Sequence, residues 1–347
     1  MIRLLDCTLR DGGYINDWKF GEKAIQNTVL DLTETGVDII ELGFLKNEPA
    51  NSERTVFNEK KQMDKLIPPH EARMHYAAMI EVVNPIPLQM LQAYDGQGVD
   101  IIRVIVWKTK HDADGNEVDA LEEGLAYCRG VVERGYKLCV QPARVEQYSD
   151  DEFVNMLQMF QQLNPMAIYV VDSWGTQSAE NVLHYARLAD QTLNPGIALG
   201  YHGHNNMMQA FDVAGRFIRE GFQRDLIVDA SVYGIGRGAG NLNLELIARY
   251  LNETQGTHYD IAPMIRIYEE CVRKIYQEQP WGYSVPYFLT AQYGCNPNYG
   301  SFYGYEMGLT GTQIQKILSR ISREDKVLFS KEKARKYYTE CLMEEFR

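Results

Sequence analysis

The stretch Ile2–Asn16, IRLLDCTLRDGGYIN, joins an apolar run to a polar turn in the way that recurs along the whole chain. Ile2–Leu5 is typical of a buried strand, and an Arg-Asp-Gly-Gly turn follows it almost directly. A second stretch, Ile197–Asn206 (IALGYHGHNN), runs in the same way from an apolar segment into His202 and His204. Both stretches predict a strand with chemically active side chains at its end.

Short apolar runs of this kind recur at fairly regular intervals, and most are followed by a helix-length segment. The further runs are Ile39–Phe44, Met74–Met79, Ile101–Val106, Leu138–Gln141, Ile168–Val171, Ala198–Tyr201 and Ile227–Val232. The expected helices are Glu22–Thr35, Pro87–Gln97, Glu117–Arg134, Ser149–Leu163, Ser178–Thr192, Met207–Glu220 and Leu242–Leu251. Alternating strands and helices predict a parallel sheet covered by helices. About eight such units in roughly 250 residues indicate an α/β fold of the (β/α)8 TIM-barrel class. A doubly wound open sheet is the alternative, but no GxGxxG turn follows the first strand.

The composition changes near residue 256, and we expect two parts. Residues 1–255 are predicted to form the TIM barrel and residues 256–347 a C-terminal helical, aromatic-rich extension. The extension should contain helices at Ile261–Gln277, Thr312–Ile321 and Lys331–Phe346. Between the first two, Trp281–Tyr305 is too aromatic for a linker, so we expect it to pack against the barrel mouth or a second subunit.

Composition narrows the class of protein. The 347 residues are 45% hydrophobic and 24% charged, as in ordinary soluble globular proteins. A net charge of −12 argues against nucleic acid as the main partner. No apolar run approaches the roughly 20 residues that span a bilayer, and no signal peptide is recognisable at the start. The six cysteines include no CxxC pair, so we expect reduced thiols in a cytoplasmic protein that contacts no membrane.

A metal site is the sharpest functional hypothesis. Two residues apart on a strand, His202 and His204 point to the same side. Asp11 follows the first strand and can add an oxygen ligand, because active-site groups of barrels gather at the carboxyl ends of the strands. One carboxylate with two imidazoles leaves coordination positions open, as catalytic metals require. Alone, the two histidines fit equally well as hydrogen-bonded structural residues.

Two further charged residues stand at strand ends. Arg10 is either an ordinary surface arginine or, beside Asp11, a group that holds an enolate or a carboxylate. Glu41, in IIELGF, should be partly buried and therefore needs a partner. We expect Glu41 to pair with Arg10 and fix its orientation.

Other candidates for substrate contacts occupy equivalent positions. They are Gln141, Arg144 and Asp172. Of these, Asp172 is expected to support the site from behind the residues that touch the substrate. The glycine-rich stretch Gly234–Asn241 (GIGRGAGN) follows the last strand, where barrels often bind anions. Either it cradles a phosphate, or Gly236 and Gly238 let the backbone approach the metal while Asn241 offers its carboxamide.

Three ordered motifs together resemble one family. TLRDGG after the first strand, HxHNN after the seventh and GxGxxxGN after the eighth are similar to the DRE-TIM metallolyases, also called HMGL-like or pyruvate carboxyltransferase-domain proteins. The resemblance covers about residues 1–255. It implies a divalent metal on Asp11, His202 and His204, with Asn241 as a further ligand, and Arg10 at the enolate oxygen.

Within that family the chain most resembles the 4-hydroxy-2-oxovalerate aldolases, which share a GYSxxxFL motif with Gly282–Leu289. The resemblance makes Tyr283 a candidate catalytic residue. The glycine loop lacks the cysteine of the CoA-thioester lyases, and CVQPAR lacks the lysine of the pyruvate carboxylases. One departure concerns the base: the aldolases carry a histidine where this chain has Tyr14, and a phenol with a pKa near ~10 is a poorer base at neutral pH.

Three hypotheses remain open. The first is a metal-dependent aldolase acting on a 4-hydroxy-2-oxo acid through a pyruvate enolate, and the second is a Claisen-type condensation of a 2-oxo acid with an acyl-CoA. The third is a non-catalytic barrel subunit. For the aldolase we expect one divalent ion, Mn2+ ahead of Mg2+, Co2+, Zn2+ or Fe2+. Its partners would be a 2-oxo acid, an aldehyde, a second copy of the chain in a homodimer, and an aldehyde-handling enzyme.

Overall fold

The core of the molecule is a closed barrel of parallel strands, as expected. The computed structural model describes residues 1–49, 51–68, 74–111 and 116–345. The barrel strands are β1 (Ile2–Asp6), β2 (Ile39–Leu45), β4 (His75–Glu81), β5 (Ile101–Val106), β8 (Lys137–Pro142), β9 (Ala167–Asp172), β10 (Ala198–Gly203) and β11 (Leu226–Ala230). They follow one another around the barrel in chain order, and β1 closes it by pairing with both β11 and β2. A short strand, β3 (Val56–Phe57), pairs with the carboxyl end of β2.

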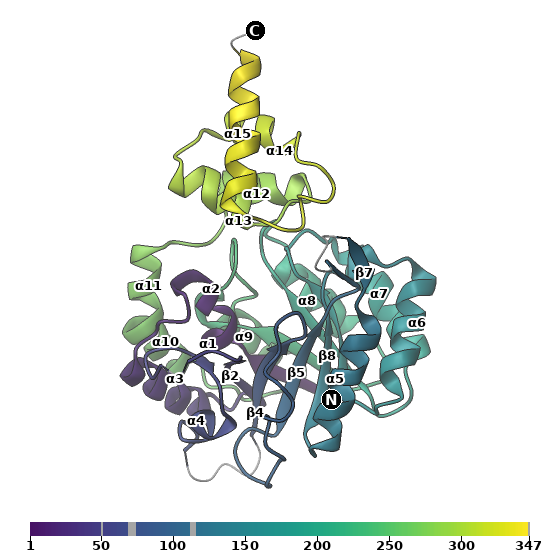
Figure 1. The fold of residues 1–347 in the computed structure, drawn as a ribbon. Helices are drawn as coiled ribbons and strands as arrows, with labels where there is room; N and C mark the ends of the chain where they lie inside the picture. The colour runs from purple at the N-terminus through teal and green to yellow at the C-terminus, as the bar shows by residue number, and fades with distance from the viewer. Residues whose placement is uncertain (50, 69–73, 112–115, 346–347) are drawn as a thin grey trace.

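Helices surround the barrel, and the apolar outer sides of the strands pack against them (Figure 1). These helices are α3 (Glu22–Thr35), α5 (Leu121–Glu133), α6 (Asp150–Gln161), α7 (Ala179–Thr192), α8 (Ala210–Arg219) and α9 (Leu244–Gln255). Serines cap two of them: Ser149 and Ser178 accept the backbone N–H groups of Glu152 and Asn181. These side chains satisfy amides that have no partner within the helix, which fixes where each helix begins.

Inside the barrel, the strands change character along their length. A small apolar cluster that includes Ile39, Ile101 and Ile227 fills the interior. Two residues further along the same strands stand Glu41, Arg103 and Asp229, all fully or almost fully buried. Because side chains two apart share a face of a strand, these charged groups lie in the next layer toward the carboxyl ends. A layer of charged side chains therefore lies beneath the mouth of the barrel, the opening at the carboxyl ends of the strands.

The prediction of a helix at Pro87–Gln97 is wrong. The segment is a series of turns whose backbone is bound by side chains from the region of α5. The carbonyl of Leu91 accepts from Arg134 Nε at 2.9 Å, and that of Gln92 accepts from Tyr136 Oη at 2.8 Å. These tertiary hydrogen bonds replace the local ones that a helix would need.

The helix expected at Glu117–Arg134 begins later than predicted. Glu117–Asp119 forms β7, which pairs antiparallel with β6 (Thr109–His111). Consequently α5 starts only at Leu121.

The C-terminal region is helical, as expected. α10 (Ala262–Ile267) and α11 (Arg273–Glu278) are joined by a π-helical turn, Tyr268–Val272, and α10 packs on α3. Beyond them lie α12 (Val285–Gln292), α13 (Asn298–Gly300), a π-helical segment Ser301–Glu306, α14 (Gly311–Leu318) and α15 (Lys331–Glu345). These last helices share a core of their own and stand above the barrel (Figure 1). Phe346, the expected end of the last helix, lies outside the described residues. No helix in the described ranges is long and apolar enough to span a membrane.

Candidate active site

Asp11, His202 and His204 come together at the carboxyl ends of the strands. One ligand atom from each lies within 4.8 Å of the others, and all three residues are buried. Asp11 belongs to a short helix, α1 (Thr8–Asp11), shortly after β1. His202 lies near the end of β10, and His204 directly follows that strand. His204 Nε2 is 3.8 Å from Asp11 Oδ2. The predicted trio therefore forms a cluster that could hold a metal ion.

The protonation states of the cluster suit a metal. Burial lowers the pKa of His204 to about 4, so its imidazole is neutral at neutral pH. Desolvation alone would raise the pKa of Asp11, but the charge of Arg10 outweighs it and holds that pKa well below its usual range. An ionised carboxylate and a neutral imidazole are the forms that coordinate metals.

Unpartnered atoms around the cluster also fit a cation. Asn241 Nδ2 donates to Asp11 Oδ2 at 2.6 Å and to the carbonyl of Ile235 at 3.0 Å, while its buried Oδ1 has no hydrogen-bond partner among the described residues. His202 Nδ1 lies 3.0 Å from Asp229 Oδ2, which leaves Nε2 free for a metal. A carboxylate behind a ligating histidine is the usual way in which proteins orient that ligand. Oxygen and imidazole donors of this kind suit a divalent ion.

A buried chain of charges links the two sides of the cluster. Arg10 contacts Asp11 and donates from Nε to Glu41 Oε2 at 2.7 Å. The same carboxylate oxygen lies 2.9 Å from Arg103 Nη1, and Arg103 also pairs with Asp229. The expected pair of Glu41 with Arg10 is thus present. It belongs to a larger network that reaches the carboxylate behind His202.

Arg103 and Asp229 were missed from the sequence. Each is a charged residue inside an apolar strand, in IIRVIV and LIVDA. The same pattern, a charged residue within an apolar strand, identified Glu41, and it would have identified Arg103 and Asp229 as well.

The glycine loop after β11 is pressed against the metal cluster. A Cβ at Gly236 would lie 2.6 Å from Asp11 Oδ2 and 2.2 Å from Asn241 Nδ2, so a side chain there would have to displace ligand atoms. Gly238 has φ +68°, and a Cβ there would lie 2.6 Å from Asn206 Oδ1. Asn206 in turn accepts the backbone N–H of Ala239 at 2.6 Å. The close backbone approach expected for this loop is present.

The other strand-end candidates divide into two kinds. Gln141 Nε2 and Arg144 Nη1 are buried and have no hydrogen-bond partner among the described residues. The Arg144 guanidinium lies 3.6 Å above the Trp174 ring and donates from Nε to Glu146 at 2.9 Å. These spare donors suit an anionic or carbonyl-bearing ligand.

Asp172 is used differently. Its carboxylate oxygens accept the backbone N–H groups of Thr176 and Gln177, both at 3.0 Å. Burial raises the pKa of Asp172 to about 7 in spite of these bonds. The side chain therefore organises the loop after β9.

The two tyrosine candidates lie further out. Tyr14 is 37% exposed, and its ring packs edge-on against Trp18 and Phe44. Desolvation, followed by the charge of Glu81, raises the pKa of Tyr14 above its ordinary value. Tyr283 is 60% exposed and makes no hydrogen bond to a described residue.

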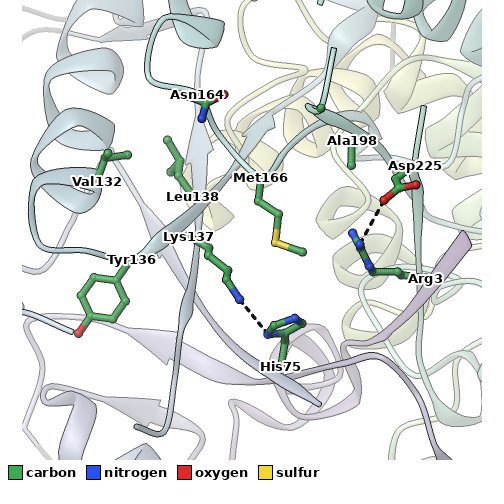
Figure 2. Close-up of a pocket in the computed structure, with 11 residues that line it drawn as sticks. Arg3, His75, Val132, Tyr136, Lys137, Leu138, Asn164, Met166, Ala198 and Asp225 are labelled. Atoms are coloured by element: carbon green, nitrogen blue, oxygen red, sulfur yellow. Dashed lines mark hydrogen bonds and ion pairs between the residues drawn. The ribbon is translucent and has the colours of Figure 1, made fainter. Parts of the chain in front are cut away.

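A cavity of about 470 Å³ lies at the opposite end of the barrel, among the amino ends of the strands. Figure 2 shows Arg3 pointing to Asp225 and Lys137 pointing to His75 across it. Lys137 also bonds Asp100, so the cations there are already paired. In barrels this end contributes to stability, and the chemistry belongs at the carboxyl ends of the strands.

Known proteins resemble the chain in sequence and fold. A 4-hydroxy-2-oxovalerate aldolase of Bacillus cereus is 26% identical over 276 residues, which cover 78% of this chain and 76% of that protein. An oxaloacetate decarboxylase of Mycobacterium tuberculosis is 21% identical over 299 residues, or 81% of this chain and 79% of that one. An N-terminal domain from Bacteroides vulgatus, provisionally assigned as an aldolase, superposes with a TM-score of 0.71 at 21% identity, over 88% of this chain and 98% of that one. The model of the HMGL-like family matches residues 1–269, and the chain belongs to that family.

Proposed function

We propose that this protein is a divalent-metal-dependent aldolase that cleaves or forms a carbon–carbon bond in a 4-hydroxy-2-oxo acid through a pyruvate enolate. The observation that carries the proposal is the buried cluster of Asp11, His202 and His204 with Arg10 beside it. Relatives named as aldolases support the reaction class. The family also includes lyases of other substrates, so the substrate is the part that needs testing.

The residues present define which groups hold the metal and the substrate. Asp11, His202 and His204, with Asn241 Oδ1, would hold a divalent ion, which supplies a Lewis acid for the 2-oxo group and carboxylate of a pyruvate unit. Arg10 already commits Nε to Glu41 and Nη1 to Asp11. Its remaining Nη2 is the donor for the enolate oxygen. Gln141 and Arg144 supply further donors at the mouth.

In cleavage, the proton leaves the C4 hydroxyl, the C3–C4 bond breaks, and its electron pair remains on the enolate as the aldehyde departs. A proton added at C3 then gives pyruvate. Tyr14 is a poor candidate for the base because its pKa is raised. We assign Tyr14 to positioning the aldehyde or a water molecule. Tyr283 lies further out and would have to move toward the metal cluster to contribute to catalysis.

The charges of the ion-paired network are balanced by such ligands. Asp11, Glu41 and Asp229 carry three negative charges against the two positive charges of Arg10 and Arg103. A divalent ion and a singly charged 2-oxo acid bring the sum to zero. In a buried, low-dielectric site, such neutrality lowers the free energy of the loaded state.

The decisive experiment measures metal content and pyruvate exchange. We expect about one divalent ion per chain, Mn2+ giving the highest rate, and exchange of the pyruvate C3 protons for deuterium, followed by NMR. His202→Ala should lose most of both, whereas His184→Ala, which removes an exposed histidine of α7, should keep both. Wild-type protein that binds no metal and exchanges no protons after Mn2+ addition would refute the proposal.

A second arm separates the aldolase from a Claisen-type condensation. Aldol cleavage releases an aldehyde, whereas condensation with an acyl-CoA releases CoA, which a thiol reagent detects. Release of CoA without turnover of any 4-hydroxy-2-oxo acid would replace the aldolase proposal with the condensing one.

The setting is also a proposal. We infer a cytoplasmic protein, since all six cysteines are free and buried, and we propose that it acts as a homodimer. An aldehyde-handling partner enzyme would consume the released aldehyde. Size-exclusion chromatography with light scattering tests the dimer.

A further inference from the structure

Two cations border an aromatic cluster at the mouth of the barrel. Tyr14, Trp18 and Phe44 pack edge-on, with ring centroids 5.0 to 6.3 Å apart. Lys46 Nζ lies 4.7 Å from the Phe44 ring and 4.9 Å from the Trp18 ring. The Arg237 guanidinium lies 5.6 Å from the Tyr14 ring. The cluster is therefore flanked by positive charge.

Neither cation forms an ion pair with a carboxylate in the described part of the chain. Arg10 and Arg144, also at the mouth, are both ion-paired. Glu81 and Asp11 are the anions that act on Tyr14, opposed by the cations Arg237 and Arg10, and the Glu81 carboxylate accepts a hydrogen bond from Trp107.

This positive region adjoins the reactive centre. The Phe44 ring, which Lys46 covers, also lies 5.9 Å from the Arg10 guanidinium. Arg237 follows Gly236, the residue pressed against Asp11. Lys46 is thus linked to Arg10 through the Phe44 ring, and Arg237 is linked to Asp11 through its neighbour Gly236.

Arg237 is held in place by the C-terminal helices. Its Nη2 donates to Asn296 Oδ1 at 2.9 Å. Asn296 is itself fixed, because its Nδ2 donates to the carbonyl of Val327 and its backbone N–H to that of Lys326. The neighbouring Pro297 packs where a Cβ of Gly238 would lie 3.2 Å away. A guanidinium fixed before binding loses less entropy when it captures a ligand.

We propose that the aldehyde half of the substrate carries an anionic group, a carboxylate or a phosphate, which Lys46 and Arg237 bind. The inference rests on the proposed aldolase function and specifies its substrate class. The buried network, the divalent ion and the 2-oxo acid already balance in charge, so the pyruvate half does not require these two cations. The anion they attract belongs to the part of the substrate that lies beyond C4.

The first test compares aldehydes in matched pairs, with pyruvate and Mn2+, using the full-length protein. Glyoxylate is compared with acetaldehyde and succinic semialdehyde with butanal for the carboxylate, and glyceraldehyde 3-phosphate is compared with glyceraldehyde for the phosphate. We expect kcat/KM to be at least about 30-fold higher for the anionic member of one type of pair, which identifies the anion. KM for that aldehyde should rise with added NaCl, because salt screens the attraction.

The second test uses variants. Lys46→Met and Arg237→Met should each reduce the ratio of kcat/KM for the preferred anionic aldehyde over its neutral partner by about 10-fold or more. Asn296→Ala should reduce the ratio less, because the Arg237 guanidinium loses its hydrogen bond to Asn296 but keeps its charge. Arg249→Met, which removes an exposed arginine of α9 that pairs with Glu253 of the same helix, should keep the wild-type ratio.

The outcomes separate the inference from the function on which it rests. Deuterium exchange into pyruvate reports on enolate formation without any aldehyde. If exchange occurs but anionic aldehydes show no advantage, or if both variants leave the ratio intact, the inference is overturned while the aldolase proposal stands. If the protein instead releases CoA from acetyl-CoA in the presence of pyruvate, the aldolase proposal fails and the inference that rests on it is overturned as well.

Discussion

The Arg10 guanidinium divides its donors among several partners, so its shape matters as much as its charge. One nitrogen faces Glu41 and another faces Asp11, within a side chain that is 4% exposed. A planar fork can hold two carboxylates and still present a donor to a substrate, which a single ammonium group cannot do. The geometry of this residue therefore relates the metal side of the site to the enolate side.

For this reason we expect Arg10→Lys to reduce aldol turnover by about 100-fold or more, a barrier increase of about 3 kcal/mol. Lysine keeps the charge but cannot satisfy Glu41 and the substrate together. Metal content, measured by elemental analysis, should stay close to that of the wild type. A near-normal rate would show that Arg10 is only structural.

Tyr14 offers a second test at this scale. With its pKa raised, the phenol is expected to position the aldehyde or a water molecule. Tyr14→Phe should then slow cleavage by only about tenfold, or about 1.4 kcal/mol, with deuterium exchange into pyruvate retained. Tyr283→Phe is the companion variant, and it should have the larger effect if the extension closes over the site. Loss of cleavage by several orders of magnitude in Tyr14→Phe, with exchange intact, would make Tyr14 the proton carrier.

Among the elements, the strands were the most predictable. Ile101–Val106 agrees at both ends, because a strand covered on both faces reads as a nearly continuous apolar run. The site could be predicted for the same reason, since the carboxyl ends of such strands must converge. What could not be predicted is decided by contacts between distant segments. The carbonyl of Leu91 accepts a hydrogen bond from Arg134, and Arg237 donates one to Asn296 of the C-terminal region. No local sequence pattern encodes either contact.

The glycine loop gives the prediction that belongs to this scale. Gly236→Ala should weaken metal binding by about tenfold or more, because its methyl group would collide with Asp11 and Asn241, whose positions are locked by hydrogen bonds. Isothermal titration of the apo protein with Mn2+ measures this. Gly215→Ala on α8 is the control: its methyl group would meet only the flexible end of Arg219 at 3.3 Å. Equal metal affinity in Gly236→Ala and the wild type would show that the close approach has no bearing on the site.

For the whole molecule, Asp172 makes stability depend on pH. Its pKa is about 7 in the folded protein and near the ordinary 3.8 when unfolded. Between these values the folded state holds a proton that the unfolded state releases, so this residue destabilises the fold as pH rises from about 4 to about 7, and the effect is absent below that window. Asp172→Asn removes the titrating group. The unfolding free energy of the apo wild type should fall relative to that of the variant by about 1 kcal/mol per pH unit in this window. Urea titrations that show a constant difference would contradict the prediction.

The six thiols are distributed over the separate cores. Cys7 and Cys139 lie in the barrel interior, Cys128 and Cys271 in the main core, and Cys295 and Cys341 in the core of the C-terminal helices. All are buried, so a thiol reagent can modify each only after its surroundings open. The rate at which each thiol is modified therefore reports how often its surroundings open. If the C-terminal helices open independently of the barrel, and more often, Cys295 and Cys341 will be labelled first. Mass spectrometry of samples taken over time from one labelling reaction of the wild-type protein measures both opening rates.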